Sequence, residues 1–327
     1  MSRNWLTIGN AAFIYSQQLD GYIPALADWV ECQALAVPSF GCDKTSLVTA
    51  LKIGNWNPPA NDIKATFDTV SEDVFLELAS RADDYAKRGY PFECDYSGRR
   101  LKFSGLSPWP YAFLLALSYT HPNSRPTKTK GSRTGAYIFE ALAWTGMNRF
   151  FGDPAPELVD LSVCHHFGSP SLSNLPGDFN KKVDHIATEF REGGKYNPLT
   201  SGHSQTSGDN GVDVLMRRGF PDRRGAQFLY FGACAAGFNW ATTKRYECDP
   251  QKFLGTRNFQ QPFIGYRGMG QCFFIPRQVG ADGWNETASM AGMVIDRCRL
   301  SLITHKSGAS YLTDAQNWTE GLFGKHF

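Results

Sequence analysis

The sequence lacks the motifs that mark several common classes of protein. None of its eight cysteines has a partner at C-x-x-C spacing, which argues against zinc ribbons and dithiol redox centres. It has no P-loop, no dinucleotide-binding fingerprint, no G-x-S-x-G elbow and no internal repeat. Its longest apolar run, around residues 111–117, is far too short to cross a bilayer. What remains is a globular, core-forming chain.

We also expect no secretion signal, because the first residues show no basic segment followed by an apolar stretch. Without a signal for export, we expect the cysteines to be reduced and mostly buried. The sequence therefore predicts a cytoplasmic protein with no membrane partner.

The composition is that of a folded protein with an uneven distribution of charge. The 327 residues are 42% hydrophobic and 20% charged, with a formal net charge of +2. Up to Arg125 there are 11 Lys and Arg against 13 Asp and Glu, whereas the rest holds 22 against 18. A polar stretch with proline and lysine over 120–132 is typical of a linker. We therefore expect a mainly helical accessory or interaction region over 1–125 and a second domain over 126–327.

The second domain alternates between helical and strand patterns. Apolar residues at helical spacing predict helices over 132–151 and 183–190, and a long helix over 287–302. Strands are predicted over 158–164, over the hairpin arms 212–216 and 227–234, and over 271–276. This order predicts an α/β fold in which helices flank a sheet.

The predicted hairpin and the helix before it carry the residues that most clearly suggest a metal-binding or catalytic role. The run Asp209-Asn-Gly-Val-Asp213 delivers an aspartate to the first arm, and Glu140 lies on an upstream helix. Carboxylates that converge from different elements can hold Mg²⁺ or Mn²⁺ for phosphodiester hydrolysis. The alternative is that these residues have no catalytic role: Asp-Asn-Gly only forms a turn, and Glu140 is an ordinary residue on the surface of a helix. Four arginines flanking the turn are candidates for contacts to DNA phosphates: Arg217, Arg218, Arg223 and Arg224.

These residues resemble the PD-(D/E)XK nuclease superfamily, in particular its Mrr-like restriction enzymes. The helix containing Tyr137-Ile-Phe-Glu140 is similar to the first core helix, and Asp213 matches the aspartate that begins the second core strand. Stretches between about residues 131 and 302 are also similar to uncharacterised superfamily members of bacterial anti-phage loci. The resemblance implies a restriction-endonuclease-like mixed sheet flanked by helices. It also implies a DNA endonuclease of anti-phage defence that uses Mg²⁺ or Mn²⁺, with Asp213 and Glu140 as metal ligands.

One position departs from the pattern of the superfamily. Its third core strand should carry Glu, Asp or Gln, then any residue, then Lys, but residues 233–235 read Ala-Cys-Ala where the hairpin folds back onto Asp213. Gln227 lies about six residues too early, roughly 20 Å along a strand. The resemblance implies that Lys244, on the segment after the hairpin, can take over the role of the lysine.

The missing third-strand ligand leaves several functions open. A backbone carbonyl near Cys234 can complete a metal site with the two acids, and an engineered inactivating substitution at Ala233 is a further possibility. Loss of the third-strand ligand instead predicts a catalytically degenerate subunit that binds nucleic acid or a partner protein of a defence complex. A third possibility is that the hairpin has no role in metal or nucleic-acid binding, in which case the chain is a structural subunit.

The run Cys164-His165-His166 also suggests zinc. Adjacent residues do not easily reach one ion, however, and the sequence offers no second zinc motif such as H-x₃-H. On the helix that follows, Asp184, His185 and Glu189 are interpreted as a surface carboxylate–imidazole group.

Overall fold

The computed structural model of the protein describes most of the chain and both predicted regions. It covers residues 22–38, 41–54, 66–85, 88–97, 99–104, 109–125, 133–152, 162–168, 171–198, 211–222, 224–237, 239–242, 249–255, 258–264, 269–305 and 311–323.

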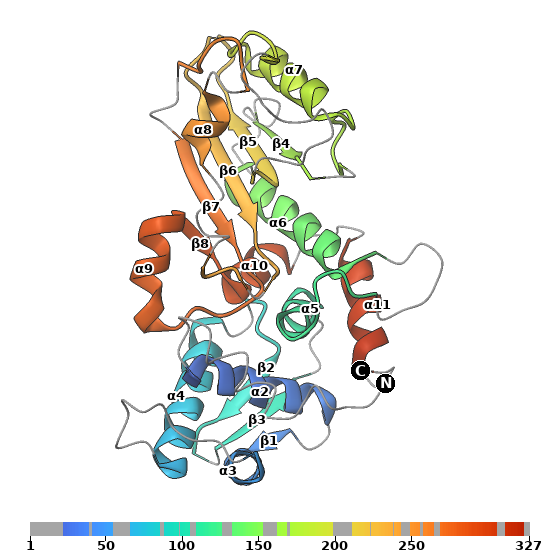
Figure 1. The fold of residues 1–327 in the computed structure, drawn as a ribbon. Helices are drawn as coiled ribbons and strands as arrows, with labels where there is room; N and C mark the ends of the chain where they lie inside the picture. Colours follow the sequence, from blue (N-terminus) through green and yellow to red (C-terminus); the bar gives the residue numbers. More distant parts are fainter. Residues whose placement is uncertain are drawn as a thin grey trace.

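Within the described residues, the N-terminal part combines three helices with a small antiparallel sheet in the order β1-β3-β2, an element that the prediction of a mainly helical region does not include. Its helices are α2 (Tyr22–Ala36), α3 (Lys44–Ile53) and α4 (Phe67–Tyr85). Its strands are β1 (Cys42–Asp43), β2 (Phe92–Asp95) and β3 (Arg100–Phe103). Helix α3 begins where Asp43 accepts a hydrogen bond from the backbone N–H of Ser46, a favourable N-cap. Figure 1 shows this part in its lower half.

The second part is built on a five-stranded sheet in the order β4-β5-β6-β7-β8. The strands are β4 (Ser162–His166), β5 (Val214–Arg218), β6 (Phe228–Cys234), β7 (Met269–Phe274) and β8 (Met293–Ile295). Strands β4, β5 and β6 are antiparallel neighbours, whereas β7 runs parallel to β6 and β8 parallel to β7. The helix α6 (Gly135–Gly152) precedes the sheet in the chain, close to the predicted 132–151.

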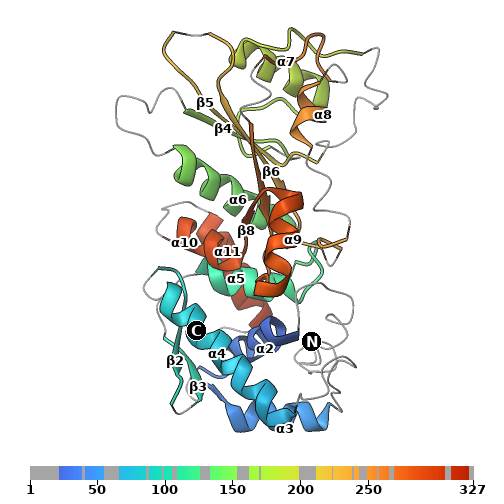
Figure 2. The ribbon, with the colours of Figure 1, turned by 90° about the vertical axis from the view of Figure 1, so that its left-hand side faces the viewer.

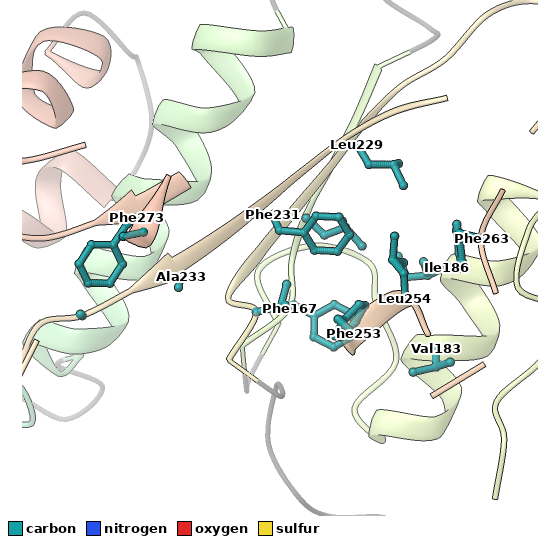
Figure 3. Packing of buried hydrophobic residues seen from close by; sticks show 14 of the residues in the cluster. Phe167, Val183, Ile186, Leu229, Phe231, Ala233, Phe253, Leu254, Phe263 and Phe273 are labelled. Carbon is teal, nitrogen blue, oxygen red and sulfur yellow. The ribbon is translucent and has the colours of Figure 1, made fainter. Parts of the chain in front are cut away.

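The two faces of this sheet are covered by different helices. On one face, Phe231 and its neighbours pack against α7 (Phe179–Phe190) and α8 (Pro250–Leu254); Figure 3 shows the Phe231 and Phe253 rings in this core. On the other face, Val214 and Phe274 pack against α6. The expectation of an α/β fold with helices flanking a mixed sheet is therefore confirmed.

Helix α5 (Trp109–Ser118) joins the two parts of the molecule. Its Tyr111 and Leu115 belong to the N-terminal core, whereas Phe113 and Leu117 belong to the core of α6 and α11 (Tyr311–Phe323). Figures 1 and 2 both show α5, α11 and α10 (Arg297–Thr304) between the small sheet and the large one. The predicted division at residue 125 thus assigns α5 to the first region. About half of the buried residues of α5, however, pack in the core of the second region.

The long helix predicted over 287–302 is wrong. Helix α9 (Ala281–Ala291) ends at Gly292, which has a φ of 78°. A Cβ at this glycine would lie 2.6 Å from the backbone oxygen of Gln271. The next three residues form β8 against β7, and Asp296 then caps α10 by accepting a hydrogen bond from the Arg299 N–H. Tertiary pairing with β7 therefore overrides a helical apolar pattern.

Two further observations concern the chain as a whole. No helix within the described residues has the length and apolar character needed to cross a membrane. The seven cysteines of that part of the chain are all free thiols, and burial raises the pKa of the Cys164 and Cys298 thiols.

Candidate active site

Strand β4 sends its two histidines to opposite faces of the sheet. His165 stands opposite Leu215 and His166 opposite Val214, which belong to the α7 and α6 cores respectively. His165 Nε2 lies 2.5 Å from an oxygen of Glu189 on α7. Because successive side chains of a strand alternate, His165 faces the opposite side of the sheet from Cys164 and His166.

Glu140 is held by a histidine that is fully buried. His166 Nε2 lies 3.1 Å from Glu140 Oε2, and His166 Nδ1 accepts a hydrogen bond from the backbone N–H of Leu172. Since Nδ1 is an acceptor, the proton of the neutral ring is on Nε2 and is donated to Glu140. A Cβ at Gly168 would lie 2.6 Å from Glu140 Oε2. A side chain at this position would therefore displace the Glu140 carboxylate or the His166 ring from the end of β4.

Asp213 is buried immediately before β5 and is fixed on both sides by backbone. Its N–H donates to Gly232 O at 2.9 Å, and its carbonyl accepts from Phe167 N at 2.7 Å. Its Oδ2 accepts from the N–H of Cys234 at 2.6 Å. The pairing of Val214 with Gly232 sets Ala233 opposite Asp213, as the sequence predicts. The third strand thus offers a backbone donor to Asp213 where the superfamily pattern has an acid or amide.

Glu140 and Asp213 lie at the same end of the sheet, where β4 ends and β5 begins. The segment 166–168 contacts both residues, because His166 bonds to Glu140 and Phe167 bonds to the Asp213 backbone. Among the described residues, however, Glu140, His166 and Asp213 do not form a group whose ligand atoms all lie within 4.8 Å of one another. The predicted metal ligands thus share one end of the sheet, and the described residues form no three-ligand site there.

A buried lysine supports the 166–168 segment. Lys182 of α7 donates from Nζ to the carbonyls of Phe167 at 2.6 Å and Gly168 at 3.1 Å. The sequence pattern does not single out this residue, because Lys181-Lys182 resembles a basic surface pair. The feature of the sequence that could have identified Lys182 is its position in the helical repeat of apolar residues. Lys182 falls at i+3 from Phe179 on the face that also buries Val183 and Ile186.

The arginines predicted to bind DNA do not act as one group. Arg217 points to the α7 face, where it donates to Glu189 O and Gln227 Oε1. Arg218 points to the α6 face and donates to Phe151 O at 3.1 Å. Adjacent strand residues must diverge in this way. Only Arg224, with 86% of its side chain exposed, is well placed on the turn for a phosphate, and Arg223 lies outside the described residues.

Two other predicted positions also lie outside the described residues, namely Asp209 and Lys244. Their predicted roles, in the turn before β5 and as the migrated lysine, stay predictions.

Comparison with known proteins adds no further assignment, since no family model, no curated protein and no solved structure matches the chain.

Proposed function

We propose that the chain is a metal-dependent DNA endonuclease with a restriction-endonuclease-like core. The observation that carries the proposal is the placement of two acids in an ordered succession of elements. Helix α6 bears Glu140, one strand follows, and Asp213 immediately precedes the second strand of an antiparallel set that continues into β6. The resemblance assigns the acids to this first helix and this second strand. A setting in bacterial anti-phage defence rests on the resemblance alone.

Asp213 and Glu140 would hold Mg²⁺ or Mn²⁺, since both ions prefer carboxylate oxygens. A bound ion neutralises phosphate charge and lowers the pKa of its water, which generates hydroxide near neutral pH. Hydrogen bonds within the protein hold both carboxylates in place: the Cys234 N–H donates to one Asp213 oxygen, and His166 orients Glu140. Lys182 places a buried positive charge on the 167–168 segment. Arg224 is the described arginine most accessible to the DNA backbone.

The second candidate is a nuclease-like subunit that binds DNA or a partner protein without cutting. The specific observation in its favour is Ala233, which stands opposite Asp213 where the superfamily places an acid or amide. With two acidic ligands in place of three, a hard cation would bind more weakly. The two candidates therefore differ in one measurable respect, which is turnover in the presence of Mg²⁺ or Mn²⁺.

Cleavage of supercoiled plasmid with Mg²⁺ or Mn²⁺ tests the proposal. We expect Asp213→Asn to cut at least about 100-fold more slowly, equivalent to about 2.7 kcal/mol of barrier, because the amide loses the negative charge that binds the ion. The asparagine retains an oxygen for the Cys234 N–H, so the fold should persist. The matched control is Asp84→Asn, an exposed acid on α4 far from the hairpin in the chain, which should cut at the wild-type rate.

Two results would overturn the proposal in different ways. Equal cutting by wild type and Asp213→Asn would assign the activity to another site or to a contaminant. Absence of cutting by the wild type with either metal, while it still retards DNA in a gel, would establish the binding subunit instead.

A further inference from the structure

A second group of metal-binding residue types lies on the opposite face of β4 from Glu140. One ligand atom from each of His165, His185 and Glu189 lies within 4.8 Å of the other two. Within the described part of the chain, this is the one group of three or more His, Cys, Asp or Glu residues that meets this condition. The group is separate from the proposed nuclease centre, since His165 and His166 face opposite sides of the sheet.

The fold brings these three side chains together by two periodicities. Helix α7 buries Val183, Ile186 and Phe190. His185 and Glu189 are one helical turn apart at i and i+4, so they project from the same side of α7. Strand alternation then directs His165 of the edge strand β4 toward them. Because both elements are anchored by buried cores, the ligands are positioned without a flexible loop.

The exposure of the group suits a cation. The His165 side chain is only 8% exposed, whereas that of Glu189 is 26% exposed and His185 is open to solvent. An ion could thus enter from the His185 side and keep a water on that side. The nearby positive charge of Arg217 opposes the ion and limits its affinity.

We propose that His165, His185 and Glu189 bind a divalent transition-metal ion of the zinc class. Two imidazoles and one carboxylate match the ligand preference of Zn²⁺, whereas Mg²⁺ favours oxygen ligands. In a tetrahedral site with bonds of about 2.1 Å, ligand atoms lie about 3.4 Å apart. His165 Nε2 and Glu189 Oε2 at 2.5 Å need only separate by small side-chain rotations to admit the ion. The fourth position would hold water or a small ligand.

Zinc titration calorimetry on the full chain after removal of metals with EDTA tests this site. We expect one ZnCl₂ to bind per chain, with affinity reduced at least about tenfold in His185→Ala and in Glu189→Gln, because each removes one of three ligands. His121→Ala is the matched control, since this exposed histidine lies on the turn after α5. In the wild type and the control, zinc should also raise the melting temperature, and this rise should be lost in the two site variants.

The cysteines could also take up zinc, so the comparison between variants decides the outcome. Zinc affinity unchanged in both site variants would place the ion elsewhere and overturn the proposal, as would absence of zinc binding by the wild type. Asp213→Asn should bind zinc like the wild type. A chain that binds zinc at this group but cuts no plasmid would therefore contradict the nuclease and leave the zinc site standing.

Discussion

Replacement of Arg297 by methionine is expected to lower the free energy of unfolding by about 3–5 kcal/mol, the usual cost of removing one partner of a buried ion pair. Arg297 is fully buried and donates to both carboxylate oxygens of Asp28, with Glu31 also in range. Arg81 completes the group from the other side, at 2.7 Å from Asp28 and 2.9 Å from Glu31. The loss of Arg297 leaves two buried carboxylates with one guanidinium.

The pKa directions in this group agree with that expectation. Burial alone would raise the pKa of Asp28, but the charges of Arg297 and Arg81 hold it below the usual value. For Glu31, burial outweighs the same two arginines and the pKa is raised. The hydroxyls of Tyr90 and Tyr111 also donate to Glu31 at 2.9 Å. Asp28 therefore depends on Arg297 more directly than Glu31 does.

Urea unfolding with a constant m-value measures the effect. The control is Arg133→Ala, because Arg133 pairs with Asp314 at 3.4 Å with side chains 42% and 38% exposed, and such a pair contributes at most about 1 kcal/mol. In the double variant Asp28→Asn with Arg297→Met, the cost should be smaller than the sum of the single costs. A change below about 1 kcal/mol in Arg297→Met would show that the two parts of the molecule do not depend on this network.

The sequence predicts those parts of the fold that follow from local patterns. Helix α6, the hairpin arms and the position of Ala233 opposite Asp213 all follow from periodicity and from the symmetry of a hairpin. The buried network could not be predicted, because Asp28 and Arg297 are separated by most of the chain and each looks like a surface charge. The same applies to β8, whose strand conformation depends on pairing with β7.

At the candidate site, too, local patterns predict single residues but not the contacts between residues that are distant in the sequence. Asp213 and Glu140 could be chosen from turn chemistry and resemblance, and the structure places both at one end of the sheet. The role of His166, which orients Glu140, could not be predicted, since it depends on the direction in which β4 runs past α6. In the sequence, His165, His185 and Glu189 look like separate local features. Only the packing of α7 beside β4 reveals them as one cluster.

Replacement of Phe231 by alanine is expected to cost about 3–5 kcal/mol of unfolding free energy through the cavity that it leaves. Phe231 lies on the central strand β6, is fully buried, and meets the ring of Phe253 edge-on at 5.8 Å between centroids. The matched control is Phe228→Ala on the same strand. Phe228 is 46% exposed, so its loss should cost less than about 1 kcal/mol. Urea unfolding of the two variants compares one chemical change at two degrees of burial.

The Phe231 variant also separates stability from chemistry at the proposed centre. Strand β6 supplies the Cys234 N–H that holds Asp213, so unfolding of this strand would release the aspartate. Phe231→Ala should therefore cut plasmid like the wild type at low temperature and lose activity only near its lowered melting temperature. Asp213→Asn should cut at least about 100-fold more slowly than the wild type at every temperature, because it lacks the charge and not the fold. Equal stability of the Phe231 and Phe228 variants would contradict the central position of β6 in the core.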